Sequence, residues 1–123
     1  MTRADHERVI RAVTQAIREI DPDRLIIADG LSWGRDPCPE LIDLGIAQSC
    51  RAYDPMGVSH YKAEWVSGEN FPKPTWPGGW HYGERWNRKR LEEYYEKWAN
   101  LARQGVGVHC GCLLYTSPSP RDS

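Results

Sequence analysis

The stretch IREIDPDRLIIADG, residues 17–30, decides the fold that the sequence predicts. It opens as the end of an apolar-periodic helix, is interrupted by Asp21-Pro22, and continues as the apolar run Leu25 to Ala28 before the turn signal Asp29-Gly30. Proline cannot continue a helix, and a short apolar run between turn signals is typical of a buried parallel strand. The stretch therefore predicts a helix followed at once by a parallel strand.

The same order of helix and strand recurs along the chain. Residues 5–20 carry apolar side chains at helical spacing with Asp5 as the expected cap, and residues 25–28 form the first strand. The later elements are expected at 39–44 (helix), 46–53 (strand), 87–103 (helix) and 106–109 (start of a third strand). This alternation predicts a parallel sheet with crossover helices, an α/β fold.

The turns after the predicted strands lack phosphate-binding motifs, and this absence narrows the type of α/β fold. No G-x-G-x-x-G and no P-loop follows any predicted strand, so a nucleotide-binding fold is unsupported. The common fold that remains is a run of βα units from a (β/α)8 TIM barrel. A whole barrel needs about 250 residues, so 123 residues would hold less than half of one.

Composition narrows the partners. A net charge of −1 argues against nucleic acid, and no apolar run has the length of a membrane span. Six Trp and six Tyr against one Phe favour flat aromatic faces with a polar handle, which suit sugar rings and also ordinary half-buried packing. The cysteines predict no disulfide framework and no cofactor. Cys110-Gly-Cys112 beside His109 lacks zinc-site spacing, so no metal is predicted either.

Five side chains are candidates for binding substrate. In a barrel, ligand-facing residues follow the carboxyl ends of the strands, and the segments 29–34, 51–61 and 109–111 occupy such places. The candidates are Trp33, Arg51, Tyr53, His60 and Trp76. Each has a structural alternative: a Trp on the barrel rim, an Arg paired with a carboxylate, a packed strand-end Tyr, a His that anchors its loop, and a Trp that pins its own turn.

At these residues the chain resembles glycoside hydrolase family 5, the cellulase-like retaining glycosidases, from Ala4 to Gly111. IREIDPDRLIIADGLSWG (17–34) is similar to the family's fifth strand with the helix before it and the loop after it. QSCRAYDPMGVSHYKAEW (48–65) is similar to the sixth strand and its loop, and GVGVHCG (105–111) to the seventh strand. The resemblance implies a fragment that holds about strands five to seven of the barrel.

The resemblance also implies roles for particular residues. The family commonly has His-x-Tyr at the sixth strand, where this chain has Arg51-Ala52-Tyr53. Tyr53 fits the tyrosine that touches the nucleophile, whereas Arg51 in place of histidine puts the local substrate contacts in doubt. The nucleophilic Glu would follow Gly111, where this chain has Cys112, and the acid/base Glu would lie before Met1. Neither catalytic residue is then present, and the chain as given is expected to be inactive.

The last residues do not continue the pattern. Residues 112–122, CLLYTSPSPRD, resemble one reading frame of an adapter used to prepare sequencing libraries; the alternative is a natural Pro/Ser-rich flexible tail. The sequence thus divides into a partial (β/α)8 glycoside hydrolase domain, residues 1–111, and a non-native or disordered tail, residues 112–123.

Three functions of different classes remain open. The first is a fragment of a retaining β-glycoside hydrolase acting on a glucan- or mannan-like polysaccharide, with a polysaccharide or oligosaccharide as partner. The second is a non-catalytic carbohydrate-binding protein on a degenerate barrel, and the third is a barrel enzyme of another chemistry, such as a metal-dependent hydrolase. The sequence does not determine the compartment or the oligomeric state. A secreted or a periplasmic location of the parent protein would both agree with it.

Overall fold

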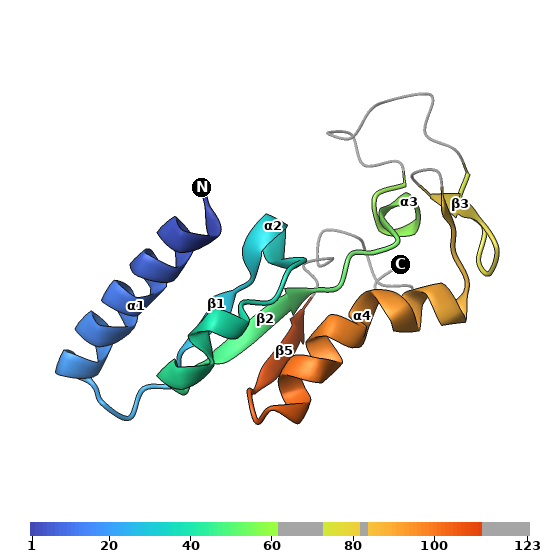
Figure 1. Ribbon diagram of the computed structural model, residues 1–123. Coiled ribbons are helices and arrows are strands. Elements are labelled where there is room, and N and C mark those ends of the chain that lie inside the picture. The colour runs from blue at the N-terminus through green and yellow to red at the C-terminus, as the bar shows by residue number, and fades with distance from the viewer. Residues whose placement is uncertain (62–72, 82–83, 112–123) are drawn as a thin grey trace, which may run out of the picture. The chain divides into compact units, whose positions relative to one another are not determined.

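The computed structural model describes residues 1–61, 73–81 and 84–111 (Figure 1). Residues 62–72, 82–83 and the tail 112–123 lie outside the described residues. The chain divides into two compact units, one made of residues 1–52 with the chain from Val106 onward, the other of residues 53–105.

The first unit opens with helix α1 (Arg3–Ile20), which the apolar spacing predicts. Its cap is Thr2 rather than Asp5. The Thr2 hydroxyl accepts a hydrogen bond from the Asp5 N–H at 3.1 Å, and the Asp5 carboxylate accepts one from the Thr2 N–H at 3.2 Å. This reciprocal pair is a capping box, and it moves the helix start two residues earlier because it satisfies donors that no turn of helix can reach.

A three-stranded parallel sheet follows, with the order β1-β2-β5. Its strands are β1 (Ile27–Asp29), β2 (Ala47–Arg51) and β5 (Val108–Gly111). The predicted alternation with parallel strands is confirmed, and the fold is a mixed α/β one with a small parallel sheet. The predicted limits of the second strand, 46–53, are too wide. The Ala52 N–H makes the last ladder bond, 2.9 Å to the Gly111 carbonyl, so Tyr53 lies beyond the strand.

Two short elements link β1 to β2. The first, α2 (Leu31–Gly34), is a tight turn directly after the strand. The second, η1 (Pro39–Leu44), is a 3-10 helix that starts with proline and ends at Gly45 with φ of +65°, as the Pro and Gly at its ends predict. The Arg11 guanidinium joins η1 to α1 by hydrogen bonds of 2.8 and 2.9 Å to the Asp43 carboxylate.

The buried side chains of this unit differ from the apolar stripe of α1. Leu41, Cys38 and the strand residues Gln48 and Cys50 are fully buried. On α1, however, Thr14 is 2% exposed while Val13 is 48% exposed, although Val13 belongs to the stripe that the sequence places in the core. The reason is geometric: η1 contacts the helix face that carries Arg11 and Thr14, which lies to one side of that stripe.

In its described residues, the second unit has two helices and an antiparallel pair of short strands. Its elements are α3 (Met56–Ser59), β3 (Trp80–His81), β4 (Glu84–Arg85) and α4 (Arg88–Arg103). Asn87 caps α4 as predicted, since its side-chain oxygen accepts the Arg90 N–H at 2.9 Å. Trp98 of this helix is buried, and Tyr94 packs edge-on against Tyr95.

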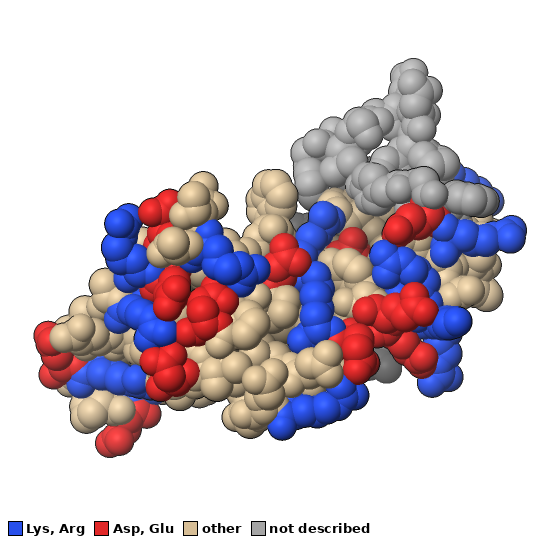
Figure 2. Space-filling model, viewed as in Figure 1, with Lys and Arg blue, Asp and Glu red and all other residues tan. Residues whose placement is uncertain are grey.

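Helix hydropathy and surface charge bear on whether the chain contacts a membrane or nucleic acid. No helix within the described ranges is long and apolar enough to span a membrane. In Figure 2, Lys and Arg side chains are interspersed with Asp and Glu over the visible face, with no large field of one sign. That surface agrees with the net charge of −1.

Candidate functional site

The carboxyl ends of the three parallel strands carry a polar network in the first unit. Asp29 ends β1, Ser49 and Arg51 lie on β2, and His109 lies on β5. The strand register pairs Asp29 with Ser49 and Ser49 with His109, so residues from distant parts of the sequence become neighbours at one level of the sheet. Parallel strands place their carboxyl ends at the same edge.

Arg51 and Asp29 form the strongest contact of this network. The Arg51 Nη2 donates to Asp29 Oδ2 at 2.6 Å and its Nε to Oδ1 at 3.3 Å, a side-on arrangement of guanidinium and carboxylate. These bonds hold the pKa of the Asp29 carboxyl below its usual range, against the opposing effect of partial burial. Asp29 is therefore ionised at neutral pH, and its charge offsets that of Arg51.

His109 is the third part of the network. Its Nδ1 lies 3.4 Å from the Ser49 hydroxyl, and its charge also lowers the pKa of Asp29. Its ring lies over Gly111, where a built Cβ would come within 2.7 Å of Cε1. Gly111 therefore leaves room for the ring to lie along the strand, next to the strand end.

The loop after β1 contains unusual backbone. Ser32 and Trp33 have φ of +54° and +58°, the left-handed region, which costs a residue with a side chain about 1–2 kcal/mol. The Trp33 side chain is 87% exposed. Gly34, with φ of +76°, lies so close to the Arg51 side chain that a Cβ would collide with it. Strained backbone that presents an exposed aromatic ring is typical of binding sites.

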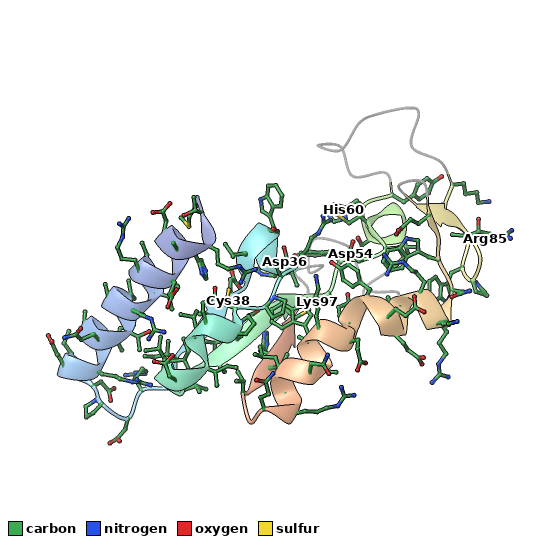
Figure 3. All side chains as sticks on the ribbon, in the orientation of Figure 1. Asp36, Cys38, Asp54, His60, Arg85 and Lys97 are labelled. Atoms are coloured by element: carbon green, nitrogen blue, oxygen red, sulfur yellow. The ribbon has the colours of Figure 1, made fainter. Side chains whose placement is uncertain are left out.

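In the second unit, Tyr53 and His60 lie together. Their rings meet edge-on with centroids 5.4 Å apart. The Ser59 hydroxyl lies 2.7 Å from His60 Nδ1 and donates to the backbone carbonyl of Tyr53 at 2.6 Å. His60, labelled in Figure 3, is 7% exposed. This geometry favours the role of anchor for the loop and for Tyr53 over direct contact between His60 and a ligand.

Trp76 lies in a turn and is 47% exposed. The turn is joined to the residues around β4, since the Gly78 N–H donates to the Trp86 carbonyl at 2.7 Å and Arg85 Nε to the Gly78 carbonyl at 3.0 Å. The ring of Trp76 is thus presented from a fixed turn.

The structure groups the five predicted residues into three local sets. Arg51 and Trp33 belong to the strand-end region of the first unit, Tyr53 and His60 touch each other, and Trp76 stands in its own turn. Three members of the polar network, Asp29, Ser49 and His109, are not among the predicted residues. Their signal in the sequence is their position at strand ends, but which of them pair depends on the register.

Comparison with solved structures finds proteins that this chain resembles, among them a glycoside hydrolase. The chain is similar to a solved structure described as the crystal structure of a glycoside hydrolase, with 43% sequence identity and a TM-score of 0.85. The match covers 91% of this chain and 35% of the other, so the chain spans about a third of that protein. No protein-family model and no curated protein matches the chain. The likeness supports a relationship to glycoside hydrolases.

Proposed function

We propose that the chain is part of a retaining β-glycoside hydrolase of the family 5 type, in which it supplies about strands five to seven of a (β/α)8 barrel. The observation that carries the proposal is the 43% identity, over 91% of the chain, to a glycoside hydrolase of solved structure. The parallel order β1-β2-β5 supports the barrel, since consecutive parallel strands with crossover connections are its repeating unit.

The binding residues have distinct roles in this proposal. The exposed Trp33 ring is a platform for a sugar face, and Trp76 serves as a second platform from its turn. Arg51, oriented by Asp29, donates hydrogen bonds to sugar hydroxyls. Tyr53 lies beside the nucleophile, and His60 holds Tyr53 and its loop in place.

The chemistry requires two carboxylates that the chain does not offer at the expected places. A retaining glycosidase uses a nucleophile and an acid/base about 5 Å apart. By resemblance the nucleophile follows Gly111, where Cys112 stands, and the acid/base precedes Met1. The residues present can bind substrate, but binding substrate and transition state equally does not accelerate the reaction. Residues 1–111 then form a partial hydrolase domain that is inactive alone.

The alternative is a non-catalytic carbohydrate-binding protein on a degenerate barrel. Arg51 favours it to some degree, because the family commonly has histidine at that place. The two proposals differ in the residue that follows Gly111 in the uninterrupted gene.

The deciding experiment begins with the uninterrupted coding sequence on both sides of residues 1–111. The hydrolase proposal expects an Asn-Glu pair upstream and Glu directly after Gly111. The restored protein should cleave β-glucans or β-mannans with retention at the anomeric carbon, whereas the 123-residue chain should cleave none. A residue other than a carboxylate after Gly111, with sugar binding but no cleavage, would establish the alternative instead.

The binding residues are tested in the same restored protein. Trp33→Ala should raise KM for the polysaccharide at least about tenfold, because it removes a stacking platform. Leu25→Ala, which removes another exposed apolar side chain of the first unit at the amino-terminal side of β1, is the matched control and should leave KM unchanged.

A further inference from the structure

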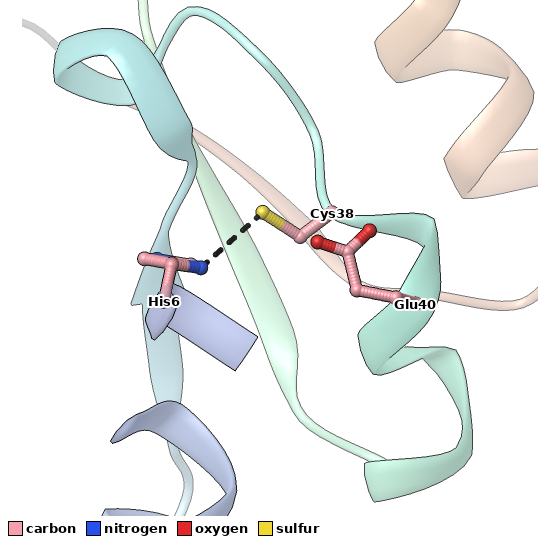
Figure 4. Close-up of side chains that lie close together, drawn as sticks. All are labelled: His6, Cys38 and Glu40. Atoms are coloured by element: carbon pink, nitrogen blue, oxygen red, sulfur yellow. Dashed lines mark hydrogen bonds between the residues drawn. The ribbon is translucent and has the colours of Figure 1, made fainter. Parts of the chain in front are cut away.

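A cluster of His6, Cys38 and Glu40 lies in the first unit, between the first turn of α1 and the start of η1 (Figure 4). Each residue offers one ligand atom: an imidazole nitrogen, the thiol sulfur and a carboxylate oxygen. All three atoms lie within 4.8 Å of one another. His6 comes from a segment more than 30 residues away from the other two, so the cluster is a product of packing.

We propose that these three side chains bind a divalent cation of the zinc class and thereby join α1 to the segment before β2. Sulfur, imidazole and carboxylate ligands together select a borderline-soft ion, and zinc is the common one. This inference does not depend on the proposed glycosidase activity. It also goes against the sequence prediction of no metal, which rests on the spacing around Cys110.

The distance between the sulfur and the imidazole nitrogen already fits tetrahedral coordination. The Cys38 Sγ lies 3.7 Å from the His6 Nδ1. In a tetrahedral site with Zn–S of about 2.3 Å and Zn–N of about 2.0–2.1 Å, these two atoms would be about 3.6 Å apart. The third ligand atom is a carboxylate oxygen of Glu40. Rotation about the three torsions of this side chain can bring the oxygen to the distance that coordination requires.

Gln48 on β2 holds the backbone of Cys38 and thereby positions its thiol. The side-chain amide of Gln48 on β2 accepts the Cys38 N–H at 2.8 Å and donates to the Cys38 carbonyl at 2.7 Å. Both residues are fully buried. These two hydrogen bonds to the backbone fix Cys38 against the sheet, as hydrogen-bond partners of metal ligands commonly do.

The carboxylate of Glu40 also forms an ion pair with Arg3. Arg3 Nη1 lies 3.0 Å from its carboxylate and also donates to the Pro37 carbonyl at 3.1 Å. The Glu40 side chain is 19% exposed and that of Arg3 50%, so this pair forms the solvent side of the cluster. A metal ion would enter there and displace Arg3 from Glu40, while the thiol proton of Cys38 passes to water.

The test is metal titration of the full chain after chelator treatment, with Co(II) as a spectroscopic probe and Zn(II) in competition. We expect one equivalent of Co(II) to give a thiolate-to-cobalt charge-transfer absorption that Zn(II) removes. Cys38→Ser should abolish that absorption, whereas Cys110→Ser, which changes an exposed cysteine elsewhere, should preserve it. No absorption in the unmodified chain, or its persistence in Cys38→Ser, would overturn the proposal.

Further variants separate metal binding from folding. His6→Asn and Glu40→Gln alter partly exposed side chains and should weaken Zn(II) binding at least about tenfold while circular dichroism shows α1 intact. Arg3→Ala should tighten binding, because it frees Glu40. Unchanged affinity in His6→Asn and Glu40→Gln, or weaker binding in Arg3→Ala, would refute the site.

Discussion

Arg51 lies at the carboxyl end of β2, in the region proposed to bind substrate. It is held side-on by Asp29 and lies against the bare backbone of Gly34, so its guanidinium is oriented before any ligand arrives. Orientation in advance lowers the entropy that binding must overcome. In the proposed glycosidase, the Arg51–Asp29 pair is the feature that sets this chain apart from the common His-x-Tyr arrangement.

Removal of Arg51 should change how stability depends on pH. The folded pKa of Asp29 lies below its unfolded value of about 3.9, so the pair stabilises the fold above about pH 4, and this contribution is lost as pH falls through the folded pKa. Arg51→Gln should therefore raise the pKa of Asp29 in an NMR titration. Its destabilisation should be present at pH 7 and shrink below pH 4. The effect is modest because the Asp29 side chain is half exposed.

The matched control is Arg88→Gln, which removes an exposed ion pair with Glu92 on α4. It should leave the pKa of Asp29 unchanged. A destabilisation by Arg51→Gln that is the same at pH 3 and pH 7 would show that the ion pair is not its cause.

Gly34→Ala should displace Arg51. Both Gly34 and Gly105 have positive φ, at +76° and +87°, so alanine at either position meets the left-handed cost of about 1 kcal/mol. Only at Gly34 would the new Cβ collide with a side chain, whereas nothing lies within 4 Å at Gly105. Denaturant unfolding should show a larger loss for Gly34→Ala than for Gly105→Ala. Equal losses would mean that Arg51 moves aside freely.

Helix α1 has one face packed against η1 and another face exposed. Its Arg11 and Thr14 face η1, while Val13 and Ile20 are exposed. Its ends are fixed by local signals: the capping box at Thr2 and the interruption at Asp21-Pro22. The face that carries Val13 and Ile20 would meet a preceding βα unit in the proposed barrel.

Thr14→Val should stabilise the chain or leave its stability unchanged. The Thr14 hydroxyl is buried and has no hydrogen-bond partner among the described residues. Because burial of an unpaired hydroxyl costs about 1–3 kcal/mol, an apolar side chain of the same shape should raise the free energy of unfolding by about 1 kcal/mol. Thr2→Ala, which breaks the capping box, should lower it by about 1 kcal/mol. If both variants destabilise alike in urea, Thr14 has a partner after all.

For the whole molecule, the decisive fact is the match to about a third of a glycoside hydrolase chain. Within the described residues, β1 lies at the edge of the parallel sheet, and its outer hydrogen-bonding groups have no partner strand. A barrel has no sheet edge, because its strands close on one another. In the proposed parent protein, a preceding βα unit would pair with this edge and bring the acid/base Glu to the strand ends, while the nucleophilic Glu would follow Gly111 at the end of β5.

Deletion of residues 112–123 should leave the thermal unfolding of the chain unchanged. That segment contains two prolines, two charged side chains and no periodic apolar face, so it has little with which to join a core. The measurement is the midpoint of thermal unfolding for the full chain and for a chain that ends at Gly111. A lowered midpoint would show that the segment is a native part of the fold.

Local patterns in the sequence were sufficient to predict α1, η1, α4 and the three parallel strands, but not the short elements α2, α3, β3 and β4. Apolar spacing predicted α1 and α4, Asn87 predicted the start of α4, and Pro39 with Gly45 predicted the limits of η1. These signals act within one or two turns of the chain, so they hold whatever the rest of the fold does. The alternation of helix and strand likewise predicted a parallel sheet, because a crossover helix connects parallel strands.

Tertiary structure alone decided which residues meet. The pairing of Asp29 with Arg51, the contact between Ser49 and His109, and the cluster of Cys38 with His6 each join residues 20 or more positions apart. Strand register and the seating of α1 against η1 set those contacts, and neither is encoded by local periodicity. The same seating buried Thr14 and exposed Val13, since burial depends on where the neighbouring element lies rather than on the polarity of the side chain.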